Sequence, residues 1–129
     1  MSKVLLLEAD RVLAGNLGAY LRKNGYRVIW SGEPQTAIEY TDEHKPDVIV
    51  MDLMLGGHGG VEFLYELRSY PEWQDLPVII LSSVSGTELE LAGTDLGQFN
   101  IAGFHYKPQT PMSSVLAAIG QVAQPIRIG

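Results

Sequence analysis

Short apolar segments alternate along this chain with segments whose apolar residues recur every three or four positions. The apolar segments cover residues 4–7, 28–30, 48–51, 78–81 and 103–106. Each is of strand length, and the first four are apolar at successive positions, which is typical of strands that are buried on both faces. The alternation predicts an α/β fold in which five β-α units form a doubly wound parallel five-stranded sheet with helices on both faces.

Four helices with regular apolar spacing are expected between or after these strands. They are predicted at residues 11–23, from Pro34 to just before Pro46, from Val61 to near Ser69, and from Met112 to Val122. For the last of them, Thr110 is the predicted N-cap and Pro111 occupies the first turn. Gly86, Gly93 and Gly97 interrupt the pattern in and just before residues 87–99, so a short or irregular helix is expected there.

Length and composition limit the chain to one folded unit and exclude several functions. The 129 residues suit one domain over residues 1–124 with a tail at 125–129, and 46% hydrophobic residues suffice for a core. A net charge of −6 argues against a nucleic-acid partner and against a basic membrane-surface role. The chain has no cysteine and no apolar stretch of bilayer length. A cytoplasmic protein is therefore expected.

Polar side chains follow four of the predicted strands, where parallel strands bring their carboxyl ends to one edge of the sheet. Glu8 and Asp10 follow the first strand, Asp52 ends the third, Ser82 the fourth and Lys107 the fifth. A carboxylate such as Asp52 is costly to bury without partners, so we expect these groups to meet. Two simpler interpretations stay open, because Asp52 is also suited to a loop or cap and Asp10 equally to the N-cap of the first helix.

The motifs that carry these residues resemble those of response-regulator receiver domains. They are Leu5-Leu6-Leu7-Glu8-Ala9-Asp10, Val48-Ile49-Val50-Met51-Asp52-Leu53-Met54-Leu55, Gly60, Leu81-Ser82-Ser83 and Tyr106-Lys107-Pro108. The resemblance covers roughly residues 3–123. It implies the flavodoxin-like strand order 2-1-3-4-5 and a protein that accepts a phosphoryl group from a histidine kinase. Beyond that self-catalysed acceptance it implies no enzyme activity.

The resemblance assigns a role to four side chains. Asp52 is implied to be the phosphoacceptor, and Lys107 to neutralise charge on the phosphoryl oxygens. Ser82 is implied to move toward the added phosphate, which brings a charge of about −1.5 to −2. Phe104, three residues before Lys107, matches the aromatic residue that moves with that hydroxyl.

A magnesium ion is implied as the cofactor of the same pocket. The implied ligands are the side chains of Glu8, Asp10 and Asp52 and the backbone carbonyl of Met54. Ala9 stands where the family usually has an acidic ligand, and Mg²⁺ is held through few carboxylates. Two outcomes are open: either Glu8 and Asp10 hold the ion together, or the affinity for metal is poor.

The implied partners are a histidine kinase or phosphotransfer protein and a downstream protein, with the chain a monomer or weak dimer. The substitution at Ala9 also supports a second hypothesis, a pseudo-receiver that acts as a protein-interaction module without phosphorylation. A small flavin or nucleotide binder is a third class. The loop after the first strand argues against it, because Glu8 and Asp10 would repel a phosphate and no glycine is present.

Overall fold

The computed structural model describes residues 2–55 and 58–124, so the predicted tail at 125–129 lies outside the described residues. Its main sheet has five strands in the order β2-β1-β3-β6-β7, and all neighbouring strands are parallel. The strands are β1 (Lys3–Leu7), β2 (Arg27–Ser31), β3 (Val48–Met51), β6 (Val78–Ser82) and β7 (Gly103–Tyr106). Since β6 and β7 are the fourth and fifth strands of this sheet along the chain, the predicted order 2-1-3-4-5 is confirmed.

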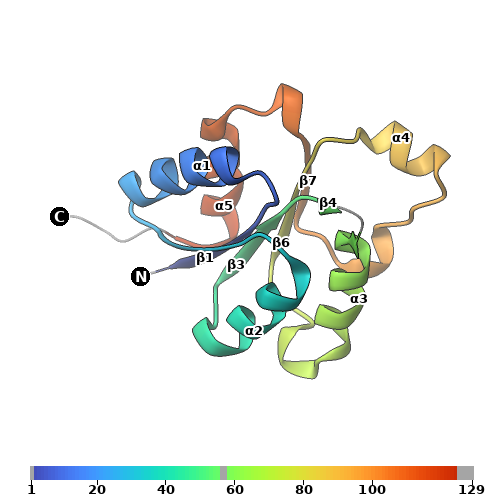
Figure 1. Ribbon diagram of the computed structural model, residues 1–129, viewed down its shortest axis with the longest axis horizontal. Coiled ribbons are helices and arrows are strands. Elements are labelled where there is room, and N and C mark those ends of the chain that lie inside the picture. Colours follow the sequence, from blue (N-terminus) through green and yellow to red (C-terminus); the bar gives the residue numbers. More distant parts are fainter. Residues whose placement is uncertain (1, 56–57, 125–129) are drawn as a thin grey trace.

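Five α-helices connect or follow these strands, as predicted. They are α1 (Arg11–Lys23), α2 (Pro34–His44), α3 (Gly60–Ser69), α4 (Gly86–Leu91) and α5 (Met112–Val122). In Figure 1, α1 and α5 lie on one side of the sheet, and α2 and α3 lie on the other. The expectation of a short helix after β6 is confirmed, because α4 has only 6 residues.

Each face of the sheet has its own hydrophobic core, because alternate residues of a strand point to opposite faces. In β1, Leu5 and Leu7 belong to the core that also contains residues of α2 and α3. Val4 and Leu6 belong to the core that contains residues of α1 and α5. The continuous apolar strands thus bury both faces and place the strand ends, with their polar residues, at the edge of the sheet.

The start of α5 differs from the prediction. Pro111 is the N-cap residue, and no side chain caps the helix. The hydroxyl of Thr110 instead donates to the carbonyl oxygen of Tyr106 at 2.7 Å, across the short 3₁₀ helix η3 (Lys107–Gln109). The predicted Thr110 cap is therefore wrong, because Pro111 occupies the N-cap position and the Thr110 side chain is turned back toward the end of β7.

A small antiparallel pair was not predicted. It is formed by β4 (Met54–Leu55) and β5 (His58–Gly59), immediately after the end of β3. Two further 3₁₀ helices, η1 (Pro71–Trp73) and η2 (Gly97–Phe99), lie in the connections that follow α3 and α4.

Candidate functional site

The ends of β1, β3 and β7 bring an ammonium group between two carboxylates. Lys107 Nζ lies 2.6 Å from Asp52 Oδ2, and 3.1 and 3.3 Å from the two carboxylate oxygens of Glu8. The backbone N–H of Asp52 donates to the carbonyl of Leu7 at 3.1 Å, which ties the ends of β3 and β1 together. Three of the predicted site residues therefore form one hydrogen-bonded group.

Both carboxylates are buried, since Glu8 is 5% and Asp52 4% exposed. Burial raises the pKa of the Glu8 carboxyl above its ordinary value, and the hydrogen bond and charge of Lys107 only partly oppose this. Burial by itself would lower the pKa of Lys107, but the hydrogen bonds to Asp52 and Glu8 together with the negative charges of these two groups outweigh it and raise that pKa. The lysine is thus charged at neutral pH and compensates the buried carboxylates.

The second oxygen of Asp52 is held by the chain that follows it. Asp52 Oδ1 accepts a hydrogen bond from the backbone N–H of Met54 at 2.9 Å. With Oδ2 bonded to Lys107, the carboxylate has a partner on each oxygen. Its orientation is therefore set before any reaction takes place.

A tryptophan that was not predicted as a site residue supports the first strand end. The indole Nε1–H of Trp30 donates to the carbonyl oxygen of Glu8 at 2.8 Å. Leu6 and Trp30 are partners in the register of β1 and β2. An aromatic donor at the end of the neighbouring strand was therefore the feature of the sequence from which this contact could have been predicted. The bond fixes the backbone of Glu8, whose side chain bonds to Lys107.

Asp10 caps the first helix instead of joining this group. Its Oδ1 accepts from the backbone N–H groups of Val12 and Leu13 at 3.0 and 3.1 Å, and the residue is exposed. Its backbone N–H donates to Glu8 Oε1 at 3.2 Å. Of the two interpretations of Asp10, the structure shows the N-cap, and a role as metal ligand stays a prediction.

Replacing Asp10 with alanine is expected to lower the free energy of unfolding by about 1 kcal/mol, because two N–H groups of α1 lose their acceptor. Urea denaturation followed by circular dichroism measures this. Asp10→Asn keeps a capping oxygen and is the matched control, expected to stay within a few tenths of a kcal/mol of the unmodified protein. A loss of the same size in both variants would show that the cap is not the cause.

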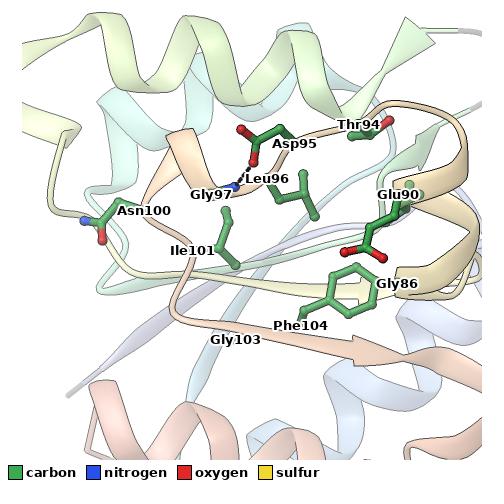
Figure 2. Close-up of a pocket in the computed structure, with 11 residues that line it drawn as sticks. Gly86, Glu90, Thr94, Asp95, Leu96, Gly97, Asn100, Ile101, Gly103 and Phe104 are labelled. Carbon is green, nitrogen blue, oxygen red and sulfur yellow. Dashed lines mark hydrogen bonds between the residues drawn. The ribbon is translucent and has the colours of Figure 1, made fainter.

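Among the described residues, neither of the two predicted switch residues bonds to this group. Ser82 is fully buried and its Oγ accepts from the N–H of Val84 at 3.0 Å. Phe104 lies opposite Ile80 in the register of β6 and β7. It lines a cavity of about 510 Å³ under α4, and Figure 2 shows its ring facing the carboxylate of Glu90. The switching roles stay predictions.

Comparison with known protein families places the chain that carries Glu8, Asp52 and Lys107 in one of them. Residues 4–115 match the family model for the response regulator receiver domain. The chain belongs to this family. The receiver domain is therefore part of the response regulators of two-component signal transduction, a family that is typically not classed as enzymes.

Two curated relatives are regulators of transcription by name. The probable transcriptional regulatory protein TcrX of Mycobacterium tuberculosis is 34% identical over 94 residues, which is 73% of this chain and 39% of that protein. The KDP operon transcriptional regulatory protein KdpE of Escherichia coli is 33% identical over 97 residues, or 75% of this chain and 42% of that protein. The receiver thus spans about two fifths of their length.

Solved structures of receiver domains have the same fold. The non-phosphorylated HemR receiver domain of Leptospira biflexa has a TM-score of 0.80 at 25% identity, covering 100% of this chain and 99% of that one. The BeF₃-activated receiver domain of Klebsiella pneumoniae RstA has a TM-score of 0.78 at 26% identity, with 94% and 97% covered. Among the described residues, no helix has both the length and the apolar character needed to cross a membrane.

Receiver domains generally bind Mg²⁺, but the residues present here do not match such a site well. In the part of the chain that the structure describes, no three acidic or histidine side chains form a group that could hold a metal ion. Asp10 is engaged as a helix cap, Ala9 offers no side-chain ligand, and the ammonium of Lys107 bridges Glu8 and Asp52.

Proposed function

We propose that this receiver domain accepts a phosphoryl group on Asp52 from a histidine kinase or a phosphotransfer protein, and relays the signal to a downstream protein. The observation that carries the proposal is the buried Asp52 carboxylate at the end of β3, held 2.6 Å from Lys107 Nζ. A cytoplasmic location and a monomeric or weakly dimeric state belong to the same proposal.

The chemistry requires a positioned nucleophile and a cation. An oxygen of Asp52 attacks the phosphorus of a phosphohistidine, the P–N bond breaks, and its electron pair stays on the imidazole nitrogen, which takes up a proton from solvent. Because phosphoryl transfer depends mainly on positioning and charge neutralisation, the Met54 N–H and the Lys107 ammonium would supply both. The hydrogen bonds already present at Asp52 support this assignment.

The proposed response begins at Ser82 and ends at Phe104. A phosphoryl group adds a charge of about −1.5 to −2 and strong acceptor oxygens. That charge would attract the hydroxyl of Ser82, at the neighbouring strand end, and draw the loop after β6 toward Asp52. Phe104, which borders the cavity under α4, would then change its position and alter the surface presented to the downstream protein.

The proposal predicts that acetyl phosphate adds one phosphoryl group to the unmodified protein and none to Asp52→Asn. Intact mass spectrometry measures the gain directly. Asp42→Asn, at an exposed position of α2, is the matched control and is expected to gain phosphate as the unmodified protein does. An equal gain in mass in Asp52→Asn, or no gain in the unmodified protein, would contradict the proposed role of Asp52 as phosphoacceptor.

A second function is favoured by the lysine bridge itself. Lys107 supplies a cation to both Glu8 and Asp52, which is compatible with a domain that binds its partner without being phosphorylated. In that case acetyl phosphate leaves the mass of the protein unchanged, and the affinity for the partner is the same for the unmodified protein and Asp52→Asn.

Magnesium affinity is expected to rise about tenfold or more in Ala9→Asp, since each carboxylate counts in a site that Mg²⁺ binds through one or two of them. Isothermal titration with MgCl₂ measures both affinities. Gly15→Ala, on the exposed surface of α1, serves as a control that leaves the pocket unchanged. If the unmodified protein binds Mg²⁺ as tightly as Ala9→Asp, then Glu8, Asp10 and Asp52 hold the ion as the family resemblance implied.

A further inference from the structure

A second cavity lies at the opposite end of the sheet from Asp52. It has a volume of about 440 Å³ and is bordered by the beginnings of β1 and β2 and the last turns of α1 and α2. Its lining residues are Lys3, Arg22, Tyr26, Arg27, Val28, Ile29 and His44. We call it the cationic cavity. Because the sheet is parallel, it shares no residue with the group around Asp52.

Positive charge is concentrated in this cavity although the whole chain carries −6. Three of the chain's 9 lysines and arginines line it, namely Lys3, Arg22 and Arg27, and no acidic residue does. Within the described residues, none of these three side chains forms an ion pair. Acids are found at the margin, where Asp47 accepts from the backbone N–H of Lys3 and Glu43 lies 4.0 Å from His44.

Two of the three cations are held in place by one hydrogen bond each. Lys3 Nζ donates to the carbonyl of His44 at 3.0 Å, and Arg22 Nη2 donates to the carbonyl of Val28 at 3.2 Å. A Cβ at Gly18 would lie 3.4 Å from Arg22 Nη1, so the guanidinium rests close over this glycine. Each cation keeps further N–H donors, and a ligand would meet groups that are already ordered.

Helix ends explain part of this charge but not all of it. Arg22 lies in the last turn of α1, and Lys3 bonds to the last residue of α2, where a cation is favourable against the helix dipole. Arg27 has no such role, because it is the first residue of the edge strand β2. Its guanidinium makes no hydrogen bond within residues 2–55 and 58–124. Capping of the ends of α1 and α2 also does not require the cationic cavity that lies between these elements.

The geometry points to a ligand site: we propose that the cationic cavity binds a small organic molecule with two or more phosphate groups, of the nucleoside-phosphate class. Two guanidinium groups suit phosphate oxygens, which they bind in a bidentate manner. Three cations match a multivalent anion. The volume falls within the range of small-molecule sites and leaves room beside the phosphates for an organic part.

The test is a titration with ATP, in buffer with a chelator so that the free anion is the ligand. Heteronuclear NMR should show saturable shifts at residues 26–29 and 44, and ATP should bind more tightly than inorganic triphosphate or adenosine. In Arg22→Gln/Arg27→Gln the dissociation constant should rise about tenfold or more, equivalent to a loss of about 1.4 kcal/mol. Lys23→Gln removes a neighbouring cation outside the cavity, and its dissociation constant for ATP should stay within about twofold of that of the unmodified protein.

Several results would overturn the proposal. They are an absence of saturable binding, shifts confined to the Asp52 end of the sheet, and equal losses in the double variant and in Lys23→Gln. Equal affinity for ATP and inorganic triphosphate would show that the cavity binds polyanions without an organic part, which contradicts the ligand class. Both arginines are exposed, so the variants are expected to fold, and thermal melts would check this. The NMR mapping on the unmodified protein needs no variant.

Discussion

Replacing Gly60 with alanine is expected to lower the free energy of unfolding by about 2–3 kcal/mol, because the added methyl group has no space. A Cβ there would lie 2.7 Å from the Cα of Leu53, 2.9 Å from Met51 Cε and 3.0 Å from the carbonyl oxygen of Asp52. Two of these atoms are backbone, so relief requires the chain around Asp52 to move. Urea denaturation measures the loss.

Gly15 is the matched control for this effect. It lies on the exposed face of α1, and nothing lies within 4 Å of a Cβ built there. Gly15→Ala is therefore expected to stabilise the protein by about 0.5–1 kcal/mol, since alanine is the better helix former. If both alanines had the same effect, close packing of Gly60 against the chain of Asp52 would not be the cause.

Replacing Lys107 with methionine is expected to lower the free energy of unfolding by about 3 kcal/mol, because Glu8 and Asp52 would stay buried without their cation. Methionine keeps the length and the apolar part of the side chain, so the lost charge is isolated. Denaturation of Lys107→Met at neutral pH measures this. Lys107→Arg retains the charge and should recover part of the loss.

The pH dependence gives that experiment an internal check. Folding raises the pKa of Lys107 above its ordinary value of 10.5. The folded protein thus holds this proton more firmly than the unfolded chain, and the stabilisation is fully present below pH 10.5. It is lost as the pH rises through the raised pKa. The difference between the unmodified protein and Lys107→Met should therefore shrink at alkaline pH, and a constant difference would contradict the role of the charge.

The predictable part of the fold was set by local patterns. The strand at Val48–Met51 and the helix at Arg11–Lys23 have the predicted bounds, because continuous apolar runs and helical spacing are properties of consecutive residues. The Thr110 cap failed because the N-cap of α5 lies one residue later than predicted, at Pro111. The 3₁₀ turn after β7 places the Thr110 hydroxyl next to the Tyr106 carbonyl, to which it donates. The β4–β5 pair follows no alternating apolar pattern, so it left no signal.

In the candidate site, too, the sequence predicted which residues are near one another but not which atoms are in contact. Parallel topology predicted that Glu8, Asp52 and Lys107 share one edge of the sheet, but it did not predict that the lysine contacts both acids. That contact depends on the length and direction of the Lys107 side chain. Because β6 lies between β3 and β7, this side chain must extend past the end of β6 to reach Asp52 and Glu8. Likewise the sequence left Asp10 with two roles, and only the position of the first turn of α1 shows that its carboxylate is a cap.

Locating the phosphoryl group tests the central claim most directly. After incubation with a phosphorylated histidine phosphotransfer protein, reduction with borohydride converts an aspartyl phosphate to homoserine, which peptide mass spectrometry assigns to one residue. The account predicts modification at Asp52 and at no other acid. Modification at a different acid, or none in folded protein exposed to an active donor, would contradict it.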